Sequence, residues 1–189
     1  MSRTRIFLYN ALSNAALQVV TLIVGFIVPR VMLVAYGSEI NGLVASVSQF
    51  IAYFNLVEAG LASAAVYSLY KPLAEKDLLG INGILSATRR FYNQSGWIFV
   101  ILVLFLSLTY PMFAKAQKLL PADIRVLVLV LGCAGVLEFF TMAKYRVLLT
   151  ADQKLYVLSV ASICAIVLNT AIITFLASRG INIVFVRAV

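Results

Sequence analysis

The chain contains five apolar stretches long enough to cross a bilayer, at residues 7–33, 43–70, 96–114, 126–149 and 155–177. A helix needs roughly 20 mostly apolar residues to cross about 30 Å of hydrocarbon. Every backbone polar group must bond internally there, so a spanning segment is a helix or part of a closed barrel. Barrel strands alternate polar and apolar residues, and these stretches do not. The sequence therefore predicts an all-α protein, a polytopic transmembrane helix bundle.

The composition supports this interpretation, because 63% of the residues are hydrophobic and the mean hydropathy is +1.02. Too few polar residues remain to build a water-soluble surface. A final apolar run at residues 181–186 is too short to cross a membrane as a helix. We expect residues 1–189 to form one transmembrane domain with five complete spans and the start of a sixth, truncated from a longer protein.

The net charge of +8 comes from basic residues scattered over short connections, which does not favour nucleic-acid binding. It fits the positive-inside bias of membrane proteins instead. With the N-terminus in the cytoplasm, the inner connections carry Arg3, Arg5, Lys71, Lys76, Arg89, Arg90, Lys144, Arg146 and Lys154. The outer ones carry Arg30, Lys115, Lys118, Arg125 and Arg179, and Arg187 is unassigned. The inner excess predicts a cytoplasmic N-terminus.

Catalytic and metal chemistry has little support. The chain has no His, and Cys133 and Cys164 each fall inside a predicted span without CxxC spacing. We expect both cysteines to be small buried packing residues. A membrane-embedded glycosyltransferase or polymerase would need a loop rich in acids or His, and the longest loop is short and basic. We therefore predict no enzyme activity, no metal and no cofactor.

The connections give further expectations. Pro72 should end the second span at Lys71, and Asp77 should cap a new helix. Apolar residues at spacings of three and four predict an amphipathic helix over 77–94 in the cytoplasmic interface. The alternative is that this segment extends the third span. The tight connection at 150–154 predicts that the fourth and fifth spans pack as antiparallel neighbours.

Polar residues follow one face of the first span: Asn10, Asn14, Gln18, Thr21 and Gly25 are spaced by four, four, three and four. At about 100° per residue they share a narrow face. Amides facing lipid would be unpaired, so this face should contact other helices or water. Two interpretations stay open, interhelical hydrogen bonds that hold the bundle together or the lining of a cavity, with Asn14 and Gln18 as candidate path residues.

The second span repeats this pattern with Asn55, also a path candidate, and Glu58 three residues further on. Glu138 is the acidic counterpart in the fourth span. A carboxylate near mid-span costs at least about 2.5–3.5 kcal/mol on insertion scales, so we expect it to face away from lipid. Glu58 and Glu138 are therefore candidate sites for coupling to protons or cations.

Three cations lie near span ends. Arg30 follows Pro29 in the first span, and Lys144 and Arg146 follow Glu138 in the fourth. Long basic side chains at span ends can reach the interface without any functional role. The other interpretation places them against a cavity, where they would suit an anionic substrate.

One region resembles a known family. The resemblance is a pattern of glycines, amides and one acidic residue over about residues 10–110. It is carried by Tyr36-Gly-Ser-Glu-Ile-Asn-Gly-Leu-Val44, Gln49-Phe50, Leu56, Glu58, Gly60, Leu69-Tyr70-Lys71-Pro72-Leu73, Ile81-Asn82-Gly83-Ile84 and Phe91-Tyr92. These stretches resemble the polysaccharide flippase family of the multidrug/oligosaccharidyl-lipid/polysaccharide exporter superfamily, which handles O-antigen and capsule repeat units.

The resemblance implies two lobes of about six helices, cytoplasmic termini, a location in a bacterial inner membrane and a central cavity with alternating access. The implied cargo is an oligosaccharide on undecaprenyl diphosphate, and the implied partners are membrane lipids and a polysaccharide polymerase. This chain would supply most of the N-terminal lobe. A cation-coupled multidrug antiporter of the same superfamily is the main alternative, and a scaffold without transport activity is a further one.

Overall fold

The computed structural model describes residues 3–113 and 119–188, with the backbone alone described at residues 3, 54–61 and 142–144. All regular structure in these ranges is helical. The elements in chain order are α1 (Arg3–Glu75), α2 (Leu78–Phe113), α3 (Pro121–Leu137), the π-helix η1 (Glu138–Met142), α4 (Ala143–Ala151), α5 (Leu155–Ser178) and α6 (Ile183–Arg187). The prediction of an all-α fold is confirmed.

Within the described residues, four helical stretches are long and apolar enough to cross a membrane: Thr4–Tyr53, Leu78–Phe113, Pro121–Thr141 and Leu155–Ser178. Large apolar side chains cover the outside of the bundle, and Phe26, Val34 and Met112 are about four-fifths exposed, at 79%, 81% and 82%. So much exposed apolar surface is unusual for a soluble monomer. The structure is therefore consistent with a membrane protein.

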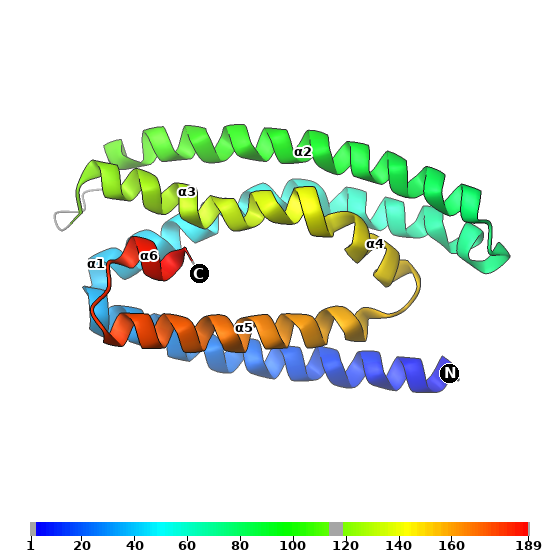
Figure 1. Cartoon of the computed structure of the whole chain (residues 1–189), viewed down its shortest axis with the longest axis horizontal. Helices are drawn as coiled ribbons and strands as arrows, with labels where there is room; N and C mark the ends of the chain where they lie inside the picture. The colour runs from blue at the N-terminus through cyan, green and yellow to red at the C-terminus, as the bar shows by residue number, and fades with distance from the viewer. Residues whose placement is uncertain (1–2, 114–118, 189) are drawn as a thin grey trace.

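Helix α1 turns back on itself at Gly37 (Figure 1). Gly37 has φ 85° and ψ 172°, a left-handed conformation that glycine adopts without a Cβ clash. The first half runs from the N-terminus to this turn, and the second half returns past α3 toward the start of α2. Beside the turn, the Tyr36 hydroxyl donates a hydrogen bond to the Ile181 carbonyl at 2.6 Å. This bond ties α1 to the connection between α5 and α6.

The second half of α1 continues past Pro72 to Glu75, so the helix ends one turn later than the proline predicted. Pro72 lacks only its own N–H, and its carbonyl accepts from the Asp77 N–H at 2.9 Å. The predicted cap at Asp77 is confirmed, since its Oδ1 accepts from the N–H groups of Leu79 and Gly80 at 3.1 and 3.0 Å. These bonds satisfy free donors in the first turn of α2.

Helix α2 is continuous from Leu78 to Phe113. No break in the helix separates residues 78–94 from the third span, and the interfacial position of that segment stays a prediction. Gly96, at the expected boundary, packs closely against the ring of Phe140 and the Cβ of Phe139. Gly132 and Gly135 of α3 likewise face Val103 and Phe99 of α2. Small residues of this kind let helices approach closely in a bilayer.

The fourth predicted span is helical from Pro121 to Ala151 but contains the π-helix η1. Contrary to the prediction, α5 does not pack along this segment. It lies along the first half of α1, and α4 approaches it mainly near the turn that joins them (Figure 1). The path of η1 and α4 carries the chain from the α2–α3 pair to α5.

At its other end, α5 finishes in a Schellman motif. Gly180, with φ 67°, donates to Ala177 at 3.1 Å, and Ile181 donates to Leu176 at 3.4 Å. The chain then reverses, and the Asn182 side chain caps α6 by accepting from the Val184 N–H at 3.0 Å. Helix α6 therefore returns into the space between α5 and α3.

The two cysteines differ from expectation. Cys133 and Cys164 are both exposed, not buried. Each lies on an apolar helix, on the face turned away from the packed neighbours. A small apolar residue there is as compatible with lipid as with a helix interface, so composition alone could not separate the two.

Candidate functional site

A cavity of about 540 Å³ lies between α1, α4 and α5. We call it the α1–α4–α5 cavity. Its apolar lining residues are Phe7, Ala11, Leu17, Leu155 and Leu158. Its polar ones come from all three helices and are Asn10, Asn14, Arg146, Thr150, Ser159 and Ser162. This combination of amides, hydroxyls and one cation can hydrogen-bond a polar, anionic group inside an apolar bundle.

A second cavity, of about 460 Å³, lies on the other side of α4 against the second half of α1. We call it the α1–α4 cavity, and it is lined by Ala62, Ser63, Val66, Tyr67, Tyr70, Arg146, Val147 and Thr150. Arg146 and Thr150 line both cavities. Arg146 therefore lies between the two cavities.

Arg146 also forms an ion pair with Glu138, with Arg146 Nη2 donating to Glu138 Oε1 at 2.5 Å. The Arg146 side chain is 56% exposed and that of Glu138 is 37% exposed, so the ion pair is only partly buried. Glu138 opens η1, and π-turns of this kind are often found at functional sites. The structure thus joins one predicted path residue to one predicted coupling residue.

Asn10 has a structural role. Its Nδ2 donates to the Gln153 carbonyl at 2.6 Å, and its Oδ1 accepts from the Tyr156 N–H at 2.9 Å. Lys154, at the N-cap position of α5, has no capping side-chain bond of its own. Asn10 therefore caps α5 from a different helix and fixes the start of α1 against the α4–α5 turn.

The remaining members of the polar face on α1 divide between cavities. Asn14 is exposed and lines the α1–α4–α5 cavity, while Thr21 and Gly25 line a further cavity nearer the Gly37 turn. Gln18 is exposed and lines none of these spaces. Both interpretations of this face thus apply in part, because Asn10 holds helices together and Asn14 lines a cavity.

The other candidates are not brought to the site. Arg30 is exposed, lines none of the cavities described above, and forms no ion pair with a described carboxylate. The side chains of Asn55, Glu58 and Lys144 lie outside the described residues. Their roles in a path or in coupling stay predictions.

Sequence reasoning overlooked the polar residues of the fifth span. Ser159 and Ser162 line the α1–α4–α5 cavity, and Asn169 lines the cavity nearer the Gly37 turn. Their spacings of three and seven place them on one helix face, the same signal that identified the polar face of α1. Arg187, which had no assignment, also lines the further cavity. Its position depends on the reversal after α5 and leaves no signal in local spacing.

No known protein-family model, curated protein or solved structure matches this chain.

Proposed function

We propose that this chain belongs to a membrane transporter that moves an oligosaccharide linked to a lipid diphosphate across a bacterial inner membrane. In this proposal each half of α1 crosses the membrane separately. Together with α2, the α3–η1–α4 segment and α5, they make five spans, and α6 begins a sixth. The N-terminus is cytoplasmic in this arrangement. The cargo would serve surface polysaccharide biosynthesis.

The observation that carries the proposal is the position of Arg146, which lines the α1–α4–α5 cavity and the α1–α4 cavity together. A diphosphate is a strong acceptor of the paired N–H donors of a guanidinium. Cations inside a membrane protein face cavities and mark substrate paths far more often than they face lipid. An anion bound to Arg146 would be reachable from both spaces.

The neighbouring polar groups suit a sugar. The amide of Asn14 can both donate and accept hydrogen bonds. Thr150 and Ser159 donate to carbonyls of their own helices, at 2.8 and 3.2 Å, which leaves their oxygens free to accept further bonds. Sugar hydroxyls need both kinds of partner when they leave water, since an unpaired buried hydroxyl is costly.

Glu138 supplies a means of control in this proposal. While the ion pair is intact, the carboxylate competes with any anion for Arg146. Protonation of Glu138, or its displacement by the diphosphate, would release the guanidinium to the cargo. This gives Glu138 a role in coupling through its effect on Arg146.

The test uses the purified full chain in vesicles that contain a fluorescent undecaprenyl-diphosphate sugar, with chemical quenching from outside to measure exchange between leaflets. We expect exchange by the wild type, a loss of at least about tenfold in R146Q, and partial retention in R146K, which keeps the charge without the paired donors. R30Q is the matched control, since Arg30 is an exposed arginine outside the cavities. The proposal fails if the wild type does not exchange the lipid, or if R146Q exchanges it as fast as R30Q.

One observation favours a cation-coupled multidrug antiporter as the second candidate. A cavity of about 660 Å³ between α1 and α5 is mostly apolar, with Ile23, Ile27 and Phe175 among its lining residues and no charged side chain. Such walls suit a lipophilic drug better than a sugar. Proton-driven efflux of a lipophilic cation from the same vesicles, unaffected by R146Q, would favour this candidate over the first.

A further inference from the structure

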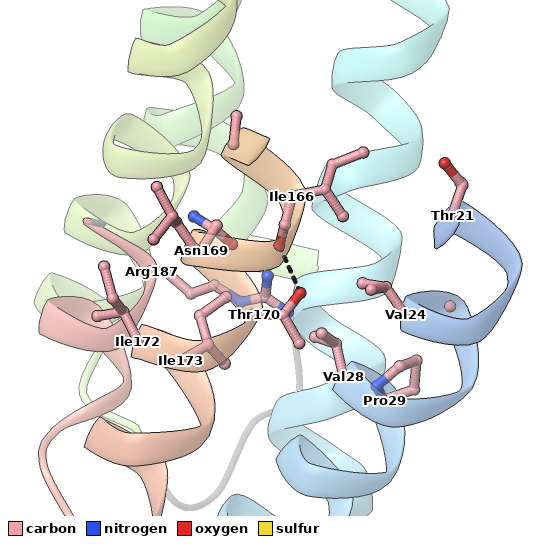
Figure 2. Close-up of a pocket in the computed structure, with 13 residues that line it drawn as sticks. Thr21, Val24, Val28, Pro29, Ile166, Asn169, Thr170, Ile172, Ile173 and Arg187 are labelled. Atoms are coloured by element: carbon pink, nitrogen blue, oxygen red, sulfur yellow. Dashed lines mark hydrogen bonds between the residues drawn. The ribbon is translucent and has the colours of Figure 1, made fainter. Parts of the chain in front are cut away.

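The largest of the described cavities, about 730 Å³, lies between α1, α5 and α6, and Figure 2 shows its lining. We call it the α1–α5–α6 cavity. Its walls are mostly apolar, with Val24, Val28, Ile166 and Ile173 among them. Arg187 supplies the charge, and Figure 2 shows its side chain extending from α6 toward Thr170 of α5.

The donors of this cavity are unusually free. The Nε of Arg187 is buried and has no hydrogen-bond partner within the described residues. Buried polar groups without partners are rare in native proteins, so each one calls for an explanation. Arg187 also forms no ion pair with a described carboxylate. A cation held against apolar walls, and unpaired with any carboxylate of the described residues, is complementary to an anionic ligand.

Asn169 adds a second donor. Its side chain lines the same cavity, and its amide has no hydrogen bond to another described residue. The two nearby hydroxyls are already used as donors, because Thr170 donates to Ile166 at 2.7 Å and Thr21 donates to Leu17 at 2.8 Å. An anion in this space would therefore be held by Arg187 and Asn169.

This cavity and the cavity that contains Arg146 lie beside the same two helices. Helices α1 and α5 line both the α1–α5–α6 cavity and the α1–α4–α5 cavity. Asn169 follows Ser159 by ten residues on α5, which corresponds to about 15 Å along the helix axis. That distance is roughly half the thickness of the hydrocarbon core. The two arginines thus lie at different depths beside the same pair of helices.

We propose that Arg187 and Asn169 form a second phosphate-binding site, which receives the lipid-linked diphosphate after it leaves Arg146. The inference rests on the proposed function for the identity of the cargo. A charged group moving through an apolar bundle faces a high barrier. A second cation at this depth divides that barrier into two shorter steps. The apolar walls beside Arg187 suit the hydrocarbon part of the carrier.

The first experiment measures binding of inorganic diphosphate, and separately of undecaprenyl diphosphate, to the purified chain by calorimetry. We expect R146Q and R187Q each to weaken one of two binding events by at least about tenfold, and the double variant to lose both. N169A should weaken the Arg187 event alone. R179Q is the matched control, since Arg179 is exposed at the end of α5, lies over the Phe175 ring and lines none of the cavities described above.

The second experiment measures leaflet exchange of the labelled lipid. We expect R187Q to bind the lipid at Arg146 as the wild type does and still to exchange it at least about tenfold more slowly. R187K, which keeps the charge, should recover part of the rate and guards against loss through misfolding. The inference is overturned if R187Q matches R179Q in both binding and exchange, or if inorganic diphosphate binds at Arg187 and the lipid does not. A wild type that binds diphosphate at Arg187 without exchanging the lipid would refute the proposed function and leave this anion site standing.

Discussion

Replacing Asn10 by alanine tests whether one amide in the first span fixes the arrangement of α1 and α5. The side chain makes two bonds, to the Gln153 carbonyl at 2.6 Å and from the Tyr156 N–H at 2.9 Å. Loss of a helix cap costs about 1 kcal/mol. Loss of the bond to the Gln153 carbonyl costs about 1 kcal/mol more. We therefore expect N10A to lower the free energy of unfolding by about 2 kcal/mol.

The assay is thermal unfolding of the purified chain in detergent, followed by circular dichroism. For a chain of this length, a loss of about 2 kcal/mol corresponds to a fall in Tm of roughly 4–8 °C. N14A is the matched control, because Asn14 lies on the same face one turn further along and makes no side-chain hydrogen bond to another described residue. Its free energy of unfolding should change by less than about 0.5 kcal/mol.

The two variants also separate structure from function. Under the proposed function, N14A slows lipid exchange without a loss of stability, whereas N10A lowers the free energy of unfolding. An unchanged Tm in N10A, or an equal fall in both variants, would refute the assignment of Asn10 as the cap of α5.

Three further changes test other parts of the structure. G132A should lower the free energy of unfolding by about 1–3 kcal/mol, because a Cβ there would overlap Val103, and denaturation in detergent measures this. Y36F should cost about 1 kcal/mol in the same assay, through loss of its hydroxyl's bond to the α5–α6 connection. The hydrogen bond to Asp152 raises the pKa of Lys154 above its ordinary value of 10.5. The stabilising effect of the Lys154–Asp152 pair should be present at neutral pH and disappear as the pH rises through the raised pKa of Lys154. D152N should remove this alkaline fall from the pH dependence of Tm.

Each of these has a control. G83A is the control for G132A, since a Cβ at Gly83 would meet no neighbouring atom within 4 Å. Equal effects of G83A and G132A would contradict close packing between α2 and α3. A Y36F variant as stable as the wild type would show that the bond to Ile181 contributes nothing. An unaltered alkaline profile in D152N would contradict the pairing of Asp152 with Lys154.

Local patterns in the sequence predicted the parts of the fold that depend on local physics. Long apolar runs predicted the helices, because the backbone of a membrane-spanning segment must satisfy its own hydrogen bonds. Asp77 was recognised as a cap because it precedes a run of helical spacing, and its bonds to Leu79 and Gly80 confirm this. The spacing of Asn10 and Asn14 predicted a shared face, which the structure turns toward α5.

The pairing of helices depended on the tertiary structure. The tight turn at 150–154 suggested that α5 would pack against the preceding helix, but α5 lies along α1. In a bilayer, lipid tails are as apolar as the helix surfaces, so apolar patterning does not say which helix faces which. Packing of small residues and a few polar bonds, such as those of Asn10, decide the pairing.

At the candidate site, too, the sequence predicted some features and the tertiary structure decided others. Sequence alone identified Glu138 and Arg146 as unusual charges within a span, since charges there are costly wherever they point. A regular helix places residues eight apart about 80° from each other around the axis, so spacing alone did not predict the ion pair that the structure shows between them. Arg187 depended on tertiary structure entirely, because the reversal at Gly180 and Asn182 brings it back against α5. Composition and spacing thus determined which segments are helical and which charges are costly, and the three-dimensional packing decided which of those charges share a cavity.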